Sequence, residues 1–292
     1  MHLKFLIVSS KISELSQDLI DEIIANDHGY AFSTTRDFIL KIEDGTFSAS
    51  TPTIADLFDF DIYLFRSFSK NMANSRIFIE ELRLRGKIVI ESCVSDNYIN
   101  SKFAEGVRLT RNNLPYPKTY QIPNFKNLEL ISDNFFPAIV KPADGSKGRD
   151  VRIINDKKEL ADFLHSATED FLIQERLEIE WDVRVFVVNG KPLGGIKRHL
   201  LDGDCRSNAS LGSRVEKFKL TPETKKLARN AAKIMRYEVA GVDLAWAKNK
   251  KRWYVIEVNI SPQWQAFKRI TGLNPAKYII ERAVSLYGKK HK

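Results

Sequence analysis

The chain has 292 residues and a formal net charge of +9; 43% of its residues are hydrophobic and 28% are charged. This length suits two or three compact lobes, and the composition is that of an ordinary globular protein. Two cysteines, Cys93 and Cys205, are too few to crosslink a chain of this size, and no apolar stretch approaches the length of a membrane span. We therefore exclude a disulfide-rich scaffold and a membrane partner and expect a cytoplasmic protein. The basic charge favours an anionic partner: a nucleotide, an acidic peptide or nucleic acid.

The first part of the chain alternates apolar strands with amphipathic helices. This alternation predicts a small parallel α/β lobe, which we assign to residues 1–99. The segment Phe32–Thr53 has a weaker pattern, which favours a hairpin around Asp44 and Gly45. The expected strands are Leu3–Ser9, Asp61–Phe65 and Lys87–Glu91, and the expected helices are Ile12–Ala25 and Met72–Arg85.

The second part of the chain is rich in strands, with its helices in runs, which predicts an α+β architecture. A helix is expected at Asn100–Arg111, and the prolines Pro115, Pro117 and Pro123 then mark a passage between lobes. Strands are expected at Ala138–Lys141, Val151–Ile154, Phe171–Gln174, Val183–Val188 and Leu193–Lys197. Further helices are expected to open at Asp156, Thr221 and Asn274, the last one ending at Gly288.

The segment Val239–Pro262 holds two apolar-alternating runs on either side of a short charged turn, which is a hairpin pattern. If the turn centres on Lys250, then Asp243 lies directly opposite Glu257. Side chains alternate along a strand, so Asp243, Glu257 and Asn259 share one face. The other face is expected to carry the apolar side chains Val242, Leu244, Trp246, Tyr254, Ile256 and Val258.

This hairpin has the chemistry of a metal site. Carboxylates directly opposite each other in a ladder repel unless something neutralises them. A hard divalent cation does so, and the side chains of Asp243, Glu257 and Asn259 all offer oxygen. The alternative interpretation is a pair of solvent-facing acids on a half-exposed sheet.

The segment KPADGSKG joins two predicted strands. Its glycines, Gly145 and Gly148, bracket Ser146 and Lys147, so that backbone N–H groups can converge on an anion. Lys141 ends the incoming strand, where its ammonium can meet a phosphate. A Walker loop needs a strand followed by a helix and another spacing, so that interpretation fails. The remaining alternative is an ordinary hairpin tip.

Groups further along the chain also suit a nucleotide. The end of one predicted strand, Gln174–Leu177, can present backbone groups to an adenine, and Asp182 can bind ribose hydroxyls. Arg198 and the run Gly203–Asn208 supply cationic and amide donors, which suit developing phosphoryl charge.

These pieces, in this order, resemble the ATP-grasp ligases, specifically the RimK-like branch. The resemblance covers roughly residues 100–290 and is carried by six ordered blocks. The blocks are VKPADGSKG (140–148), IQERL (173–177), WDVRVFVVNGKPLGGIKR (181–198), GDCRSNASLG (203–212), VAGVDL (239–244) and EVNISP (257–262). The resemblance implies an ATP-grasp fold, in which two α+β subdomains, about 100–175 and 176–292, enclose a nucleotide behind the N-terminal α/β lobe.

The resemblance also implies roles by position. The residues implied to hold ATP are Lys102 and Lys141 at the phosphates, Glu175, Arg176 and Leu177 at the adenine, Asp182 at the ribose, and the covering loop with Gly145, Ser146, Lys147 and Gly148. The residues implied to contact the transferred phosphate and the acceptor are Arg206 and Asn208, with Lys141 neutralising charge. The implied ligands of Mg²⁺, or of Mn²⁺ as the alternative ion, are Asp243, Glu257 and Asn259.

The implied reaction forms an acylphosphate from a carboxylate and ATP, and an amine then attacks it to give an amide, ADP and phosphate. The expected partners are ATP, an acidic amino acid such as glutamate, and a peptide or protein acceptor; a homo-oligomer is left open. Two alternatives remain: a nucleic-acid or ribosome-binding protein on this scaffold, and an ATP-dependent phosphotransferase. Nucleic acid is disfavoured because the sequence lacks basic stretches interleaved with aromatic residues.

Two further features bear on the acceptor. Gln263 and Trp264 stand where relatives carry a small residue after the Ser-Pro pair, which implies a different acceptor shape. Spare cations near the expected site would suit anionic substrates; they are Arg184, Lys197, Arg198 and Arg214.

Overall fold

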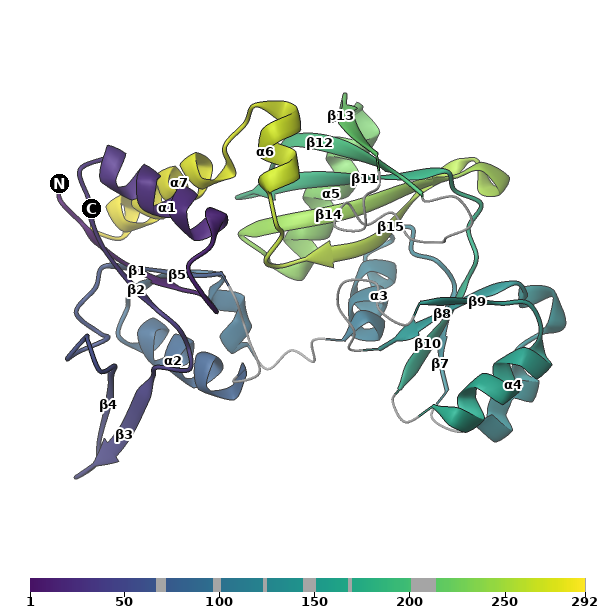
Figure 1. The fold of residues 1–292 in the computed structure, drawn as a ribbon, viewed down its shortest axis with the longest axis horizontal. Helices are drawn as coiled ribbons and strands as arrows, with labels where there is room; N and C mark the ends of the chain where they lie inside the picture. The colour runs from purple at the N-terminus through teal and green to yellow at the C-terminus, as the bar shows by residue number, and fades with distance from the viewer. Residues whose placement is uncertain are drawn as a thin grey trace.

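A computed structural model describes residues 1–66, 72–96, 101–122, 125–143, 151–167, 170–200 and 214–291. Within these ranges the strands form three larger sheets and one two-stranded hairpin, with helices packed on the sheets (Figure 1). This arrangement confirms the predicted class, a parallel α/β lobe followed by antiparallel α+β subdomains. None of the helices in these ranges has the length and apolar character that crossing a membrane requires.

The N-terminal sheet is parallel, with the strand order β2-β1-β5-β6. Its elements are β1 (Lys4–Val8), α1 (Glu14–Ala25), β2 (Gly29–Ser33), β5 (Ile62–Phe65), α2 (Met72–Leu84) and β6 (Ile88–Ile90). Alternate residues of β1 point to opposite faces: Phe5 and Ile7 join the core beneath α1, whereas Leu6 and Val8 join the core beneath α2. Burial on both faces explains why the strands are almost continuously apolar.

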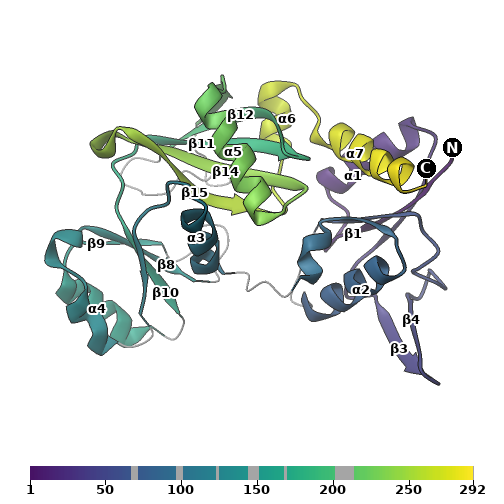
Figure 2. The ribbon, with the colours of Figure 1, turned by 180° about the vertical axis from the view of Figure 1, so that it is seen from behind.

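The predicted hairpin around Asp44 and Gly45 is confirmed by β3 (Ile39–Glu43) and β4 (Thr46–Ser50). Asp44 and Gly45 have φ values of 48° and 71°, which a two-residue turn between twisted strands requires. The hairpin projects away from the N-terminal sheet, as the view from behind shows (Figure 2).

The two remaining sheets are antiparallel. The second sheet has the order β7-β10-β8-β9, and the third has the order β13-β12-β11-β14-β15. The second sheet and its helices comprise α3 (Lys102–Arg111), β7 (Thr119–Gln121), β8 (Ala138–Pro142), β9 (Arg152–Ile154), α4 (Lys157–Ser166) and β10 (Phe171–Glu175). The third comprises β11 (Trp181–Val188), β12 (Lys191–His199), β13 (Val215–Phe218), α5 (Pro222–Met235), β14 (Val239–Ala247), β15 (Arg252–Asn259) and α6 (Gln265–Thr271). Short 3₁₀ turns occupy Ser92–Ser95, Phe125–Leu130, Asp133–Phe135 and Lys248–Lys250.

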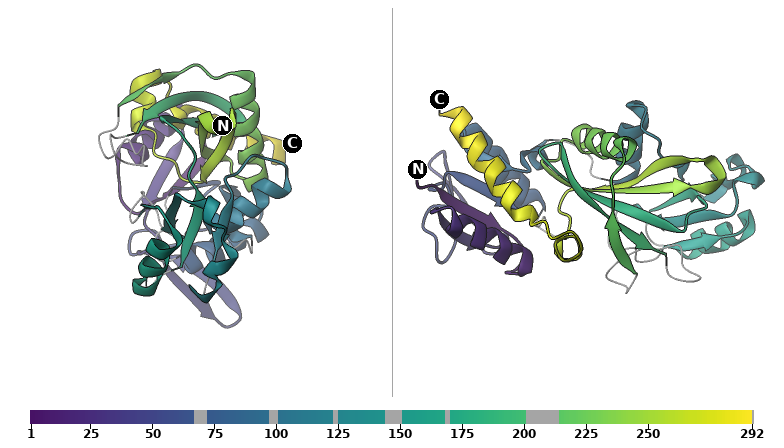
Figure 3. Two further views of the ribbon diagram at one scale, coloured as in Figure 1. Left: turned by 90° about the vertical axis from the view of Figure 1, so that its right-hand side faces the viewer. Right: turned by 90° about the horizontal axis from the view of Figure 1, so that it is seen from above.

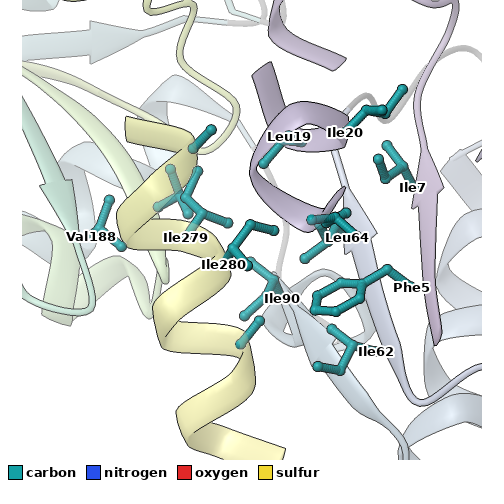
Figure 4. Close-up of a cluster of buried hydrophobic side chains, with 14 of the residues drawn as sticks. Phe5, Ile7, Leu19, Ile20, Ile62, Leu64, Ile90, Val188, Ile279 and Ile280 are labelled. Atoms are coloured by element: carbon teal, nitrogen blue, oxygen red, sulfur yellow. The ribbon is translucent and has the colours of Figure 1, made fainter. Parts of the chain in front are cut away.

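The C-terminal helix α7 (Pro275–Lys290) returns to the beginning of the chain and lies beside α1 (Figures 1 and 3). Its buried side chains join one hydrophobic core with the N-terminal sheet and with the third sheet. Ile280 of α7, Leu64 of β5 and Val188 of β11 belong to this core, which Figure 4 shows in close-up. The N-terminal lobe and the third sheet are therefore held together by a shared core.

One expectation about the elements was wrong, and the elements β2, β7, β13 and α6 were not predicted. Helix α7 does not end at Gly288 but continues to Lys290. A glycine inside a helix costs about 1 kcal/mol, which packing of the buried face of α7 offsets. The strand Gly29–Ser33 was not predicted, because its segment is only partly buried at the edge of the sheet and lacks a clear apolar pattern.

The shared core makes a testable prediction about stability. Ile280→Ala removes a side chain that is 1% exposed, so we expect the free energy of unfolding to fall by roughly 2–5 kcal/mol through lost burial and a cavity. Urea unfolding measures this change. The control is Ile42→Ala, at a side chain 81% exposed in the β3–β4 hairpin, where we expect a change below about 0.5 kcal/mol. Equal losses in both variants would contradict the role of α7.

Candidate active site

The hairpin of β14 and β15, which carries the candidate metal ligands and is called the metal hairpin below, has the predicted pairing from Gly241 to Asp243. Asp243 of β14 pairs with Glu257 of β15, and Gly241 pairs with Asn259. The Asn259 amide nitrogen lies 3.4 Å from a carboxylate oxygen of Glu257 and 3.4 Å from the carbonyl oxygen of Gly241. Two carboxylates and one amide are thus gathered at the end of the hairpin.

The predicted apolar face of the hairpin was wrong in part, because the pairing shifts by one residue directly after Asp243. Leu244 now pairs with Val255, and an extra residue lies in β15, which is a β-bulge. A shift of one residue moves the following side chains to the opposite face. Tyr254 therefore packs on Leu177 and Ala247, in a small cluster that Ile256 also joins, rather than with Val242. The bulge places an apolar cluster beside the acids.

Four charged side chains on the same face form a buried network. Arg184 donates two hydrogen bonds to Asp243, of 2.7 and 2.6 Å, and Arg198 donates two to Asp182, both of 2.6 Å. An Arg198 nitrogen also lies 3.0 Å from an Asp243 oxygen. The pairing of β11 with β12 and with β14 sets these residues opposite one another. The two arginines neutralise the two aspartates.

The network fixes the charge state of its members. Burial alone would raise the pKa of Asp243, but the charges and hydrogen bonds of Arg184 and Arg198 hold that pKa below its usual value. Burial would lower the pKa of Arg198, yet Asp243 and Asp182 raise it above its usual range. Asp243 and Arg198 therefore both remain ionised, although each is less than a tenth exposed.

The cations expected to be spare are instead engaged. Arg184 and Arg198 hold the two aspartates, and Lys197 and Arg214 form ion pairs with Glu216, of 2.9 and 3.5 Å. The Arg184–Asp243 pair joins strands far apart in the chain and is not visible in the local sequence, whereas Arg198 and Asp182 pair across the adjacent strands β11 and β12.

The two lysines expected at the phosphates approach the metal hairpin from the second sheet. The Lys102 ammonium lies 3.4 Å from a Glu257 oxygen, and the Lys141 ammonium donates a 3.0 Å hydrogen bond to the Gln174 side chain. Burial, helped by the nearby charge of Lys102, lowers the pKa of Lys141 to about 8, against the opposing effects of Glu257 and Glu105. The structure thus brings Lys102 to Glu257, one of the three candidate metal ligands, and keeps Lys141 close enough for the charge of Glu257 to act on it.

Glu105 was not predicted, yet its side chain connects α3 with β15. Its carboxylate oxygens, both at 3.2 Å, accept from the Val258 N–H on the outer edge of β15. The carbonyl of Pro115 accepts from Val255 on the same strand at 2.8 Å. Burial raises the pKa of Glu105 to about 8, with the charge of Glu257 adding to the effect. An acid in an amphipathic helix looks like a surface residue, so the sequence carried no usable signal for Glu105.

The expected adenine segment joins the second sheet to the third. Glu175 ends β10, and one of its carboxylate oxygens accepts from the backbone N–H of Lys118 at 3.0 Å. Leu177 is buried against Tyr254 in the apolar cluster, directly before β11. A nearly buried leucine beside an aromatic ring suits a flat, apolar base.

Several expected site residues lie outside the described residues. They are Gly145, Ser146, Lys147, Gly148, Arg206 and Asn208. Within the described ranges, no three or more His, Cys, Asp or Glu side chains are grouped so that they could hold a metal ion. The candidate metal set has two acids and one amide, which suits Mg²⁺, because that ion binds through one or two carboxylates together with phosphates and water.

Comparisons with known proteins agree with this geometry. The model of the RimK-like ATP-grasp domain matches residues 100–283. A probable alpha-L-glutamate ligase of Legionella pneumophila is 28% identical over 210 residues, or 70% of this chain and 69% of that protein. The tetrahydromethanopterin:alpha-L-glutamate ligase of Methanosarcina acetivorans is 26% identical over 284 residues, or 83% of this chain and 88% of that protein.

Among solved structures, the ATP-grasp ligase PsnB, complexed with a phosphomimetic variant of its minimal precursor, Mg and ADP, has a TM-score of 0.75. Its sequence is 18% identical, and the match covers 97% of this chain and 98% of PsnB. The fold is therefore that of the ATP-grasp ligases. The chain belongs to the RimK-like ATP-grasp family and is an ATP-dependent carboxylate–amine ligase.

The buried network makes a prediction that needs no substrate. Asp182→Asn leaves Arg198 with one partner fewer in a buried place, so we expect unfolding to become easier by roughly 3–5 kcal/mol. The control is Asp59→Asn, which breaks an ion pair with Lys4 in which the side chains are 73% and 57% exposed. There we expect a loss below about 1 kcal/mol. Urea unfolding compares the two variants, and similar losses would show that the network adds little.

Proposed function

We propose that this ligase joins glutamate, or a closely related acidic amino acid, to a carboxylate of a peptide or protein. The observation that carries the proposal is the contact between Lys102 of α3 and Glu257, which lies opposite Asp243. This contact supports a site in which Lys102 would meet a phosphate beside two acids that would hold a metal ion. One named relative is a glutamate ligase and another is a probable one, and PsnB was also solved with a precursor peptide; these relatives support glutamate and a peptide as the substrates.

In this proposal each end of the site has its own task. Asp243, Glu257 and Asn259 would hold Mg²⁺, and Lys102 and Lys141 would contact the phosphates of ATP. Glu175, Arg176 and Leu177 would hold the adenine and Asp182 the ribose, with the covering loop formed by Gly145, Ser146, Lys147 and Gly148. Arg206 and Asn208 would contact the transferred phosphate and the acceptor.

The chemistry asks the chain for positioning and for charge neutralisation. The acceptor carboxylate attacks the γ-phosphate and gives an acylphosphate and ADP, and both reactants are anionic. Lys102 and Lys141 offset this charge while the sheets hold the reactants in line. Bound Mg²⁺ supplies further neutralisation of the phosphate oxygens. The amine of the amino acid then attacks the acyl carbon, and the phosphate leaves.

Binding of ATP and Mg²⁺ would give the two buried aspartates new partners in place of their arginines. Asp182 and Asp243 are held by Arg198 and Arg184 in this structure. Mg²⁺ at Asp243 would release Arg184, and the ribose at Asp182 would compete with Arg198. Each released guanidinium could then donate two hydrogen bonds to a bound phosphate, an acceptor that suits bidentate donation. The network would thereby keep the site neutral before ATP and Mg²⁺ bind.

The direct test is mass spectrometry of candidate peptides incubated with ATP, Mg²⁺ and single amino acids. We expect mass increases that correspond to glutamate residues, together with release of ADP and free phosphate. Because surface attraction weakens with ionic strength, kcat/KM for an acidic amino acid should fall as salt is added. Addition of neutral or basic amino acids alone would overturn the acidic-substrate proposal. Phosphate that stays on the peptide would indicate a phosphotransferase instead.

A second prediction concerns the metal residues. Glu257→Gln removes one negative charge with little change of volume, so we expect ADP release to fall at least about a hundredfold while the fold persists. Circular dichroism and the unfolding midpoint check the fold. The matched control is Glu238→Gln, whose carboxylate pairs with Arg282 away from the hairpin acids. Near-normal ADP release by Glu257→Gln would refute the metal assignment.

A further inference from the structure

Within the part of the chain that the structure describes, two buried guanidinium nitrogens of Arg66, Nε and Nη1, have no hydrogen-bond partner. Its third nitrogen, Nη2, donates to the carbonyl of Pro262 over 3.4 Å, which is a long hydrogen bond. The residue is only 7% exposed. Unpaired buried donors are costly and rare in native structures, and a missing ligand is one of their ordinary causes.

The backbone of Arg66 is fixed at both of its polar groups. Its N–H donates to the Val8 carbonyl at 2.8 Å, which continues the ladder between β1 and β5. Its carbonyl accepts from the hydroxyl of Ser261. The position of the side chain is therefore set by the parallel sheet on one side and by the segment after β15 on the other.

The guanidinium itself is also held in place. It lies over the ring of Trp264, 5.1 Å from the centroid, a distance typical of a cation–π contact. The Trp264 ring is fully buried, and its Nε1–H donates to Asp18 of α1 at 2.8 Å. A guanidinium stacked on a fixed ring presents its nitrogens in a defined plane, which suits a planar carboxylate.

The surroundings of Arg66 leave its positive charge largely uncompensated. Burial lowers the pKa of Arg66 only to about 10, so the group stays charged at neutral pH. The acid whose charge acts on it is Glu91, which directly follows β6 and accepts from the Val239 N–H at 2.7 Å. Burial raises the pKa of Glu91 to about 8, so this carboxyl is mostly neutral at pH 7.

Arg66 lies where a parallel sheet ordinarily binds ligands. It follows β5 directly, at the carboxyl edge, and β1 and β5 flank the point where the strand order reverses. Pro262, which accepts its hydrogen bond, packs against Gly241 so closely that an added Cβ would come within 2.7 Å of the Pro262 Cβ. Gly241 pairs with Asn259 of the metal hairpin. The guanidinium is thus connected to the candidate metal site through one packed residue.

We propose that Arg66 binds a non-reacting carboxylate of a substrate, and that Trp264 positions it for this task. The inference rests on the proposed function, because glutamate and a peptide with a free C-terminus both carry such a carboxylate. The chemistry is shared by the two sources, and kinetics can distinguish them. Trp264, noted in the sequence as a departure from the family, gains a role as the platform of this guanidinium.

The test compares Arg66→Met and Arg66→Lys in the ligation assay. We expect Arg66→Met to raise the KM for one carboxylate substrate roughly ten- to a hundredfold, because a charged hydrogen-bonding pair is lost. The KM for ATP and the unfolding midpoint should change little, and Arg66→Lys should restore part of the affinity. A rise confined to glutamate assigns the amino acid. A rise confined to the peptide, absent when its C-terminus is amidated, assigns the acceptor.

The matched control is Arg282→Met, which removes a paired arginine from α7 and breaks its bond to Glu238. Equal rises in both variants, or unchanged KM values for both carboxylate substrates in Arg66→Met, would overturn the proposal. Unchanged KM values in Arg66→Met would mean that the unpaired nitrogens of Arg66 donate only to a buried water molecule.

A binding measurement separates this proposal from the proposed function. Glutamate, glutarate and glutamine are titrated against the full chain with ADP and Mg²⁺ by calorimetry, and a peptide is titrated with its C-terminus free or amidated. If Arg66→Met weakens the binding of a carboxylate probe, the result supports the proposal, whether or not ligation is found. A failure to find ligation would count only against the proposed glutamate ligation. Equal binding of every carboxylate probe by the wild type and by Arg66→Met would overturn the proposal.

Discussion

Buried charge must be neutralised, and this requirement dominates the face of the third sheet where the candidate active site lies. Asp182 and Asp243 are nearly inaccessible to solvent, and they form ion pairs with Arg198 and Arg184. Removing one partner from such a pair leaves a buried charge uncompensated, which strongly destabilises the folded state. The strands β11, β12 and β14 must therefore keep their mutual pairing for the charges to meet. The strand pairing brings the opposite charges together, and the charge pairs in turn stabilise that strand pairing.

The same requirement extends to the second sheet. Lys102 approaches Glu257 across the junction, while Glu105 and Pro115 accept hydrogen bonds from the exposed edge of β15. An edge strand with free N–H groups is otherwise open to wrong pairing, and these contacts cover it. Helix α3 thus closes the edge of the third sheet and brings a phosphate-binding candidate to the metal hairpin.

The sequence predicted those features that depend on local periodicity. The hairpin register from Gly241 to Asp243 followed from alternation and from the turn, and most strands and helices followed in the same way. Alternation could not show the bulge after Asp243, since an inserted residue leaves the apolar run unbroken. Nor could local patterns show the pair of Arg184 with Asp243, which joins strands far apart in the chain, whereas Asp182 and Arg198 pair across the adjacent strands β11 and β12. The division of the chain at residue 99 stays a prediction.

Arg66 shows what a stricter use of topology could have found. The sequence DIYLFR places an arginine directly after a buried strand, at the edge where parallel sheets bind ligands. The shared core of α7, the N-terminal sheet and the third sheet fixes this edge against the segment Asn259–Pro262. Relative motion between the lobe and that segment would separate Arg66 from Pro262 and Trp264. A rigid shared core at this junction is therefore what allows a residue of the first lobe to take part in a site built by the third sheet.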